Sequence, residues 1–303
     1  MSRIQNILEK AERDGAVMRT GRMVPFEPQV AVTAPGAGLP SPVKDPTAAT
    51  VLPSSTAGVI APAAAATSHG VAPVEEAFTS HTAILNPLLV AGLAPKSHAA
   101  EQYRSLRTRL AQMEGSGGLR TVLITSPQKG EGKSVTASNL ALTIAQELQR
   151  RVVLVEADLR KPSLQHLFGL PPGPGLSEYL SGAVDLKDAM RFVPEHNLTL
   201  LTAGAAPVNP AELLGSTAMR RLIDHLRSRF DRVIFDTPPV LPLADVAILA
   251  PLVDGSLMVV RAGVTPKPAI ENALRAFDSS RLLGVVLNES GVEQDYRYEA
   301  VTN

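Results

Sequence analysis

Short apolar runs separated by helical stretches recur along the C-terminal two thirds of the chain. The runs lie at Thr121–Thr125, Val152–Glu156, Leu198–Thr202, Arg232–Asp236, Ser256–Arg261 and Leu283–Leu287. They are nearly continuous in apolar side chains, which is typical of strands buried on both faces of a parallel sheet. After the first run, Leu140, Ile144 and Leu148 recur at helical spacing along one face. The pattern predicts an α/β fold of three layers, with a mainly parallel central sheet between helices.

The first 82 residues follow a different pattern. Residues 2–19 place Ile4, Ile7 and Leu8 on one side of a short amphipathic helix, which either frays alone or docks on a partner. Residues 21–82 are rich in Ala, Pro, Ser, Thr and Gly, and they show no regular period. Such a segment buries too little apolar surface to offset its ordering entropy, so we expect a disordered linker. The predicted organisation is a helix over 1–20, a linker over 21–82, a folded domain over 83–290 and a flexible tail over 291–303.

Composition narrows the classes of function. The chain has 303 residues, and Lys+Arg and Asp+Glu balance at 29 each, so bulk charge does not favour a nucleic-acid partner. The absence of cysteine excludes disulfides and thiolate metal sites. No run of about 18 apolar residues occurs, and the N-terminus does not resemble a secretory signal. We therefore expect a cytoplasmic protein without a membrane span.

The stretch TVLITSPQKGEGKS, residues 121–134, combines a strand, a Gly-rich loop and a Lys-Ser pair at a helix start. Proteins hold nucleoside triphosphates with this arrangement, because Gly130 and Gly132 let the backbone approach the phosphates. Lys133 would reach the β- and γ-phosphates, and the Ser134 hydroxyl would bind Mg²⁺. Pro127 occupies the first Gly position of the strict motif, so a Gly-rich turn without a ligand is the alternative. The predicted ATP contacts in this segment are Gln128, Lys129, Gly130, Glu131, Gly132, Lys133, Ser134 and Val135.

Acidic residues follow two further strands. The stretch VVLVEADLRKP delivers Glu156, Asp158 and Arg160, and RVIFDTPPV delivers Asp236. Ligands of open parallel sheets bind at the carboxyl ends of the strands, and buried acids there are costly unless a cation meets them. Mg²⁺ bound to a triphosphate is the natural partner, and helix caps or loop salt bridges are the alternative.

From about Lys96 to Asn288, the chain resembles the bacterial tyrosine kinases of capsule and exopolysaccharide synthesis. The resemblance covers about two thirds of the chain and rests on TSPQKGEGKS, VEADLRKP, GLSEYLSG, NPAELLGS, FDRVIFDTPPVLPLADV and EQYRSLRTRL. It implies a P-loop NTPase fold and an ATP- and Mg²⁺-dependent protein-tyrosine autokinase. That activity would regulate exopolysaccharide or capsule synthesis and export.

The resemblance also assigns roles. Lys133 would contact the phosphates, while Asp158 and Asp236 would hold Mg²⁺ or take the tyrosine proton. Arg160 would either meet phosphate charge or form a structural ion pair. Asn288 resembles the position that reads the adenine in related folds.

Two features depart from the family pattern. The first acid of the second motif is usually Asp, and here Glu156 carries one more methylene, which moves a metal–water contact by roughly 1 Å. The tail, QDYRYEAVTN, holds only Tyr296 and Tyr298 where the family has a dense tyrosine cluster. The two tyrosines are predicted to be phosphoacceptors, and an inert frayed end is the alternative. Each phosphate would add about −1.5 to −2 charge, which should loosen an assembly of copies.

Assembly and partners follow from the resemblance. Glu101, Arg104 and Arg107 match the family motif E-x-x-R-x-x-R, whose helix packs kinase domains into a ring. Family members are either fused to a membrane adaptor or work with a separate one, and this chain resembles the separate type. We therefore expect self-association into a ring and an activating membrane adaptor of the polysaccharide co-polymerase type. That adaptor would recruit the kinase to the inner face of the membrane, and no nucleic acid is expected as a partner.

Two other functions remain open. A Min-type or Par-type ATPase shares this fold but uses a lysine at the second position of its loop, where this chain has Gln128. A kinase-weak, ATP-binding scaffold of the polysaccharide export machinery is the other alternative, because Glu156 and the sparse tail depart from the kinase pattern.

Overall fold

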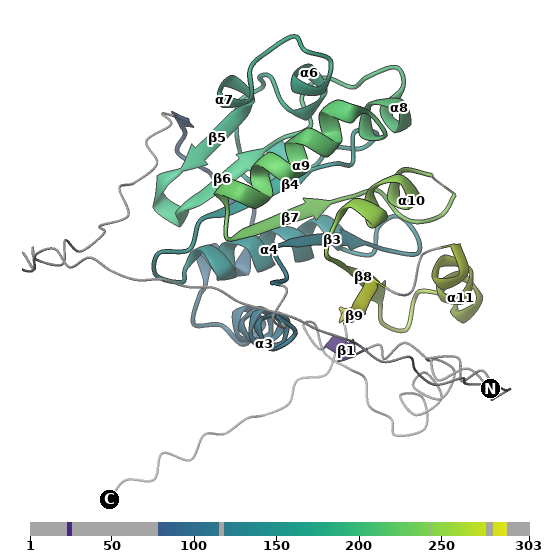
Figure 1. The fold of residues 1–303 in the computed structure, drawn as a ribbon. Coiled ribbons are helices and arrows are strands. Elements are labelled where there is room, and N and C mark those ends of the chain that lie inside the picture. Colours follow the sequence, from purple (N-terminus) through teal and green to yellow (C-terminus); the bar gives the residue numbers. More distant parts are fainter. Residues whose placement is uncertain (1–22, 26–77, 115–117, 243, 277–280, 290–303) are drawn as a thin grey trace, which may run out of the picture. The chain divides into compact units, whose positions relative to one another are not determined.

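One sheet of nine strands runs through the part of the chain that the structure describes (Figure 1). The computed structural model describes residues 23–25, 78–114, 118–242, 244–276 and 281–289, all within one compact unit. Neighbouring strands follow the order β1-β9-β8-β3-β7-β4-β6-β5-β2. The strands are β1 (Met23–Pro25), β2 (Thr79–Ser80), β3 (Thr121–Thr125), β4 (Val152–Glu156), β5 (Met190–Val193), β6 (Leu198–Leu201), β7 (Arg232–Asp236), β8 (Gly255–Arg261) and β9 (Leu282–Asn288).

The central strands are parallel. β3 pairs with β7 and β8, and β4 pairs with β7 and β6, all in parallel. Among the described strands, the antiparallel pairs are β1 with β9 and β5 with β6. Register places Asp236 at the end of β7 beside Ile124 of β3 and Glu156 of β4. The segments that follow these three strands therefore leave the sheet at one edge, where ligands of such sheets bind.

Helices cover both faces of the sheet. α3 and α4 lie on one face, and α9 and α10 lie on the other (Figure 1). The helices are α2 (Val90–Leu93), α3 (His98–Gln112), α4 (Lys133–Ala145), α5 (Leu164–Leu167), α6 (Leu176–Leu180), α7 (Leu186–Ala189), α8 (Pro210–Leu214), α9 (Thr217–Arg229), α10 (Asp245–Leu249) and α11 (Lys267–Ala276), with 3-10 turns η1 (Pro194–His196) and η2 (Ala250–Leu252). None of the described helices is long and apolar enough to cross a membrane.

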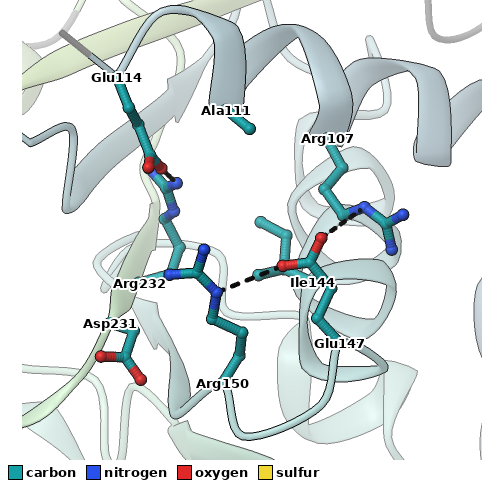
Figure 2. A pocket seen from close by; sticks show the side chains of 8 residues that line it. All are labelled: Arg107, Ala111, Glu114, Ile144, Glu147, Arg150, Asp231 and Arg232. Atoms are coloured by element: carbon teal, nitrogen blue, oxygen red, sulfur yellow. Dashed lines mark ion pairs between the residues drawn. The ribbon is translucent and has the colours of Figure 1, made fainter.

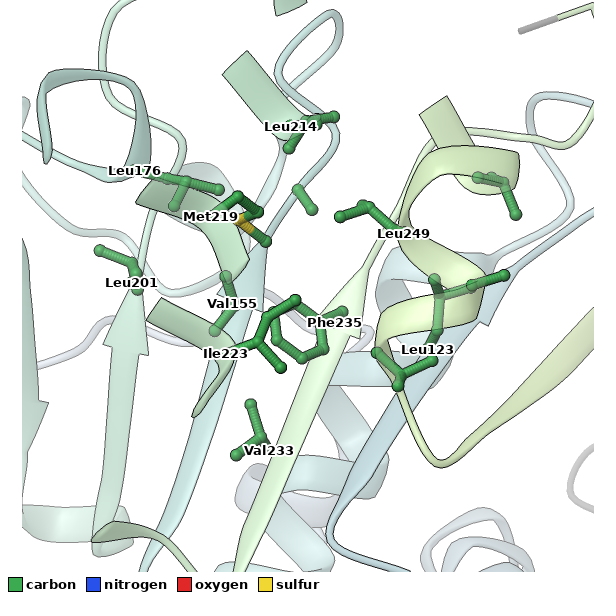
Figure 3. Close-up of a cluster of buried hydrophobic side chains, with 14 of the residues drawn as sticks. Leu123, Val155, Leu176, Leu201, Leu214, Met219, Ile223, Val233, Phe235 and Leu249 are labelled. Atoms are coloured by element: carbon green, nitrogen blue, oxygen red, sulfur yellow. The ribbon is translucent and has the colours of Figure 1, made fainter. Parts of the chain in front are cut away.

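Side chains of the central strands alternate between two buried clusters, one on each face of the sheet. In β7, Val233 and Phe235 join the cluster under α9 and α10, whereas Ile234 joins the cluster under α3 and α4. Figure 3 shows the first cluster, with Phe235 and Ile223 at its centre. Burial on both faces explains why these strands are almost uniformly apolar, and it confirms the predicted three-layer α/β fold.

The predicted strands match the observed ones closely. The runs predicted at 121–125, 152–156 and 232–236 agree with β3, β4 and β7 to the residue, and β6, β8 and β9 differ by one residue at their ends. β1 and β2 lie within residues 21–82, for which a linker is predicted, and residues 26–77 of that segment lie outside the described residues. Each of them pairs with a strand distant in sequence, which local composition does not encode. The helix predicted over residues 2–19 lies outside the described residues.

The burial of Phe235 in the core allows a quantitative prediction of stability. Phe235→Ala should lower the free energy of unfolding by about 3–5 kcal/mol, because Phe235 is 1% exposed and its removal leaves a cavity. Urea unfolding followed by circular dichroism measures the change. Val208 is 95% exposed, so Val208→Ala is the matched control and should change stability by less than about 0.5 kcal/mol. Equal effects of the two substitutions would contradict the described packing.

Candidate active site

The loop after β3 has the geometry of a phosphate-binding turn. Gly130 and Gly132 have φ angles of +82° and +86°, a region that L side chains rarely adopt. Gly132 is the N-cap of α4, so the helix begins at Lys133. The loop thus leads directly into the positive end of a helix dipole, where backbone N–H groups without helical partners bind anions.

Asn288, the last residue of β9, lies against this loop. Its Nδ2 donates a hydrogen bond to the carbonyl oxygen of Glu131 at 3.0 Å. A Cβ atom at Gly132 would lie 2.0 Å from the same Nδ2, so both the positive φ angle and this close approach require glycine there. The structure therefore brings the predicted adenine-reading residue to the loop, and one of its amide hydrogens holds the loop backbone.

The Lys133 ammonium joins the ends of three strands. Its Nζ lies 2.8 Å from Oδ2 of Asp158 and 3.6 Å from Oδ1 of Asp236. It also donates to the Ser134 hydroxyl at 3.2 Å. Lys133 and Asp158 are buried, and Asp236 is completely buried. The structure thus unites the predicted lysine, serine and two aspartates in one cluster.

Burial dominates the electrostatics of this cluster. Burial alone would lower the pKa of Lys133, but Asp236 and Asp158 outweigh it and hold that pKa above its usual value. Burial also raises the pKa of the Asp236 carboxyl, and the Lys133 ammonium opposes the rise. Within the described residues, neither Asp236 oxygen makes a well-formed hydrogen bond, although the Ser134 hydroxyl and the Lys133 ammonium lie close enough to lower its pKa in part. A fully buried carboxylate with unused lone pairs suits a hard divalent cation, whose preferred ligands are oxygens.

Glu156 does not take part in the ion pairs of Lys133 within the described chain. Its Oε1 accepts hydrogen bonds from the backbone N–H groups of Ser163 and Leu164, the latter at 2.7 Å, and its Oε2 accepts from Ala203 at 3.1 Å. Burial raises the pKa of the Glu156 carboxyl to about 7, against the lowering effect of the Leu164 and Ser163 bonds. The Glu156 side chain therefore accepts hydrogen bonds from backbone groups.

Arg160 forms the structural ion pair that was one of its two predicted roles. Its Nε and Nη2 donate to the two carboxylate oxygens of Asp245 at 2.7 and 3.1 Å. Asp245 is buried and begins α10, after the loop that leaves β7. This bidentate pair connects the loop that carries Asp158 with the loop that follows Asp236. Sequence reasoning missed Asp245, although an acidic residue at a helix start after the third motif was a usable signal.

Glu131 is a buried carboxyl inside the loop itself. It is 4% exposed, and within the described chain neither carboxylate oxygen makes a well-formed hydrogen bond. Burial raises its pKa to about 7, and the Thr265 hydroxyl and the Gln128 N–H offset this rise only in part. Thr265 follows β8, so the loop is enclosed by the ends of β8 and β9. In contrast, Gln128 and Lys129 are exposed.

The residues predicted to mediate assembly lie apart from this cluster, on α3. Arg104 pairs with Glu101 on the same helix and donates to the carbonyl of Pro95. Arg107 pairs with Glu147 at 3.1 Å and donates to the Thr143 carbonyl at 3.0 Å. Arg107 and Glu147 line a cavity of about 40 Å³ together with Arg150, Glu114 and Arg232 (Figure 2). Arg232 begins β7 and Asp236 ends it, so the cavity lies at the opposite end of the strand from the cluster.

The remaining predicted residues are placed as follows. Val135 lies in the first turn of α4 and is partly exposed. Tyr296 and Tyr298, the predicted phosphoacceptors, lie outside the described residues. Tyr103, in contrast, is buried in α3, which excludes it as an accessible acceptor in this structure.

The fold and the loop geometry define a P-loop NTPase-type domain. No protein-family model matches the chain. The chain is 39% identical over 212 residues to tyrosine-protein kinase YwqD of Bacillus subtilis, a match that covers 69% of this chain and 89% of YwqD. It is 34% identical over 210 residues to the succinoglycan biosynthesis transport protein ExoP of Rhizobium meliloti, covering 68% of this chain and 27% of ExoP.

Solved structures agree with these relatives. The kinase domain of Escherichia coli tyrosine kinase ETK superposes with a TM-score of 0.63 at 30% identity, covering 72% of this chain and 86% of that domain. The chimerical protein CapA2B2 superposes with a TM-score of 0.64 at 31% identity, covering 70% and 92%. The chain belongs to the bacterial tyrosine-protein kinase family, and its described fold is that of the family's kinase domain. This confirms the resemblance and disfavours a Min-type or Par-type ATPase.

The buried Glu131 carboxyl predicts a pH-dependent stability. Its native pKa of about 7 lies above the ordinary value of 4.5, so the native state loses stability relative to the unfolded state as pH rises from about 4.5 to about 7. Glu131→Gln removes that penalty without changing the size of the side chain. We expect the variant to melt at a higher temperature than wild type at pH 8, with a difference that shrinks toward pH 4.5. Scanning calorimetry across this range tests the sign, and a difference independent of pH would contradict it.

Proposed function

We propose that the chain is an ATP- and Mg²⁺-dependent tyrosine autokinase that phosphorylates Tyr296 and Tyr298 and regulates exopolysaccharide or capsule synthesis and export. The observation that carries this proposal is the buried cluster in which Lys133 faces both Asp158 and Asp236 beside a phosphate-binding turn. The names of the relatives support the polysaccharide context, since ExoP is called a succinoglycan biosynthesis transport protein.

Mg²⁺ fits the residues that are present. The buried oxygens of Asp236 make no well-formed hydrogen bond within the described chain, and the Ser134 hydroxyl lies close to them in the same cluster. Ser134 and Asp236 would hold the ion, with Asp158 either as a further ligand or as the acceptor of the tyrosine proton. When bound, it would neutralise charge on the phosphates of the nucleotide.

The chain's own groups would perform the transfer. The Lys133 ammonium and the N–H groups at the start of α4 would bind the β- and γ-phosphates and stabilise charge that spreads over their oxygens. As the proton acceptor, Asp158 would take the proton of the tyrosine hydroxyl while the tyrosine oxygen forms a bond to the γ-phosphorus. The bond between that phosphorus and the β–γ bridging oxygen would break, leaving ADP. Phosphoryl transfer depends mainly on such positioning and charge neutralisation, which suits a cluster held by buried strands.

The proposed partners follow from the family. We propose that copies assemble into a ring through the face of α3 that carries Glu101, Arg104 and Arg107. A membrane adaptor of the polysaccharide co-polymerase type would activate the kinase and bring it to the inner face of the membrane from the cytoplasm. Residues 2–19 and the linker would connect the two proteins. A kinase-weak ATP-binding scaffold remains the second candidate, because Glu156 stands where the family has aspartate.

Phosphotyrosine mass spectrometry tests the proposed activity. The full chain is incubated with ATP and Mg²⁺, with and without a synthetic peptide of residues 291–303 as an added acceptor. We expect phosphate on Tyr296 or Tyr298, because these are the tyrosines of the tail. Nucleotide hydrolysis without phosphotyrosine, on either the chain or the peptide, would instead favour the scaffold.

Two controls keep this experiment interpretable. Lys133→Met should abolish phosphorylation, but it also leaves buried carboxylates without their cation and should destabilise the chain. Asp236→Asn removes a costly buried charge while preserving shape, so it should remain folded and also lose activity. Circular dichroism verifies folding of both variants, and a fully active Asp236→Asn variant would contradict the assigned role.

Assembly is tested separately on α3. Glu101 is the most exposed member of its motif, with 63% of its side chain accessible. Glu101→Lys should therefore leave the monomer fold intact and lower the mass of the assembly measured by multi-angle light scattering. Glu271 on α11 also forms an ion pair within its own helix, so Glu271→Lys is the matched charge-reversal control. An unchanged mass for Glu101→Lys would count against assembly through this face.

A further inference from the structure

Glu156 occupies an unusual position at the end of β4. In backbone register it lies beside Asp236, and Asp158 follows two residues later. Its side chain is completely buried. Yet the ion pairs that the structure describes for Lys133 are with Asp158 and Asp236, and not with Glu156. The carboxylate of Glu156 therefore makes its hydrogen bonds away from Lys133, although its charge still helps to raise the pKa of Lys133.

The carboxylate of Glu156 holds two separate segments. Oε1 accepts the consecutive N–H groups of Ser163 and Leu164, at the start of α5, and Oε2 accepts the N–H of Ala203, just after β6. Ser163 occupies the N-cap position of α5, but its own hydroxyl makes no capping bond and has no partner within the described chain. Glu156 thus caps α5 from seven residues upstream and ties the helix to the neighbouring strand.

This arrangement closes a short connector that carries a site residue. Residues 157–162 run from the end of β4 to α5, and Asp158 lies within them. The connector is held at its start by the bond from the Ala157 N–H to the Asp236 carbonyl at 2.7 Å, and at its far end by Glu156. Inside it, Asp158 Oδ1 accepts the Lys161 N–H at 3.0 Å, which leaves Oδ2 facing Lys133.

Side-chain length distinguishes this role from that of the family's aspartate. An aspartate at position 156 lacks one methylene, so its carboxylate would end roughly 1 Å short. It could not keep the 2.7 Å bond to Leu164 or the 3.1 Å bond to Ala203 without movement of the backbone. A glutamine would keep the length and one accepting oxygen, but it would turn an amide donor toward the Ala203 N–H.

We infer that Glu156 is a positioning residue of the kinase: it holds the 157–162 connector closed and thereby fixes Asp158 against Lys133, and it neither binds the metal nor accepts the tyrosine proton. This inference rests on the proposed function for its effect on catalysis. We call the hydrogen bonds of Glu156 to the N–H groups of Ser163, Leu164 and Ala203 the clasp. The clasp is a property of the folded chain and can be measured without kinase activity.

The order of activities among substitutions tests the inference. We expect Glu156→Gln to lower kcat about tenfold, and Glu156→Asp and Glu156→Ala to lower it about a hundredfold, because positional errors near 1 Å cost that much. The KM for MgATP and the Mg²⁺ concentration that gives half-maximal rate should stay within twofold of wild type in Glu156→Gln, since Lys133 and the loop are unchanged. Autophosphorylation of the full chain supplies these rates.

A metal ligand or proton acceptor would give the reverse order. The inference is overturned if Glu156→Asp, which restores the family's residue, is more active than Glu156→Gln. It is also overturned if Glu156→Gln raises the Mg²⁺ requirement more than tenfold, or if all three variants keep the wild-type kcat.

Hydrogen exchange measures the clasp independently of kinase activity. In the full chain without nucleotide, the Ser163, Leu164 and Ala203 amides should exchange at least tenfold faster in Glu156→Ala than in wild type, and unchanged exchange would overturn the inference. Glu178 offers a matched control, because its carboxylate similarly accepts the Gly175 and Ala205 N–H groups, both at 2.9 Å. Glu178→Gln should speed the exchange of the Gly175 and Ala205 amides and leave kcat unchanged. A wild-type chain without phosphotyrosine would refute the proposed function. The exchange rates would still show whether Glu156 holds the three amides.

Discussion

The contact of the Lys133 ammonium with Asp158 and Asp236 is the interaction on which the rest of the site depends. A carboxylate as buried as Asp236 is unfavourable by several kcal/mol unless a cation lies close by. The parallel register of β3, β7 and β4 supplies that cation, because it brings the loop before Lys133 to the same edge as both acids. A shift of one residue in β7 would turn Asp236 to the other face and leave Lys133 with one partner.

Around this cluster, side chains hold the backbone of the loops. Glu156 closes the connector that carries Asp158, and the pair of Arg160 with Asp245 joins that connector to the segment after β7. Asn288 holds the loop between β3 and α4 from the other side. The loops at the carboxyl edge are therefore fastened by polar contacts, while the strands beneath them are fastened by apolar packing.

The helix that begins at Lys133 also links the site to the face predicted for assembly. Arg107 of α3 pairs with Glu147 and donates to the Thr143 carbonyl, near the end of α4. Asn139, in the middle of α4, accepts the Ala91 N–H and donates to the Leu88 carbonyl. α4 is thus fastened to α2 and α3 along its length.

The sequence by itself determined the layered α/β fold, the central strands, the turn with Gly130 and Gly132, and the acids Asp158 and Asp236. These features depend on local signals: apolar runs, glycine at positions of positive φ, and polar residues just after a strand. Only the tertiary structure decided where Glu156 directs its carboxylate, that Arg160 pairs with Asp245, and that Asn288 holds the loop. It also decided that β1 and β2 add to the edges of the sheet. Each of these joins groups far apart in the chain, or depends on the reach of a side chain within a space that exists only after the strands have packed.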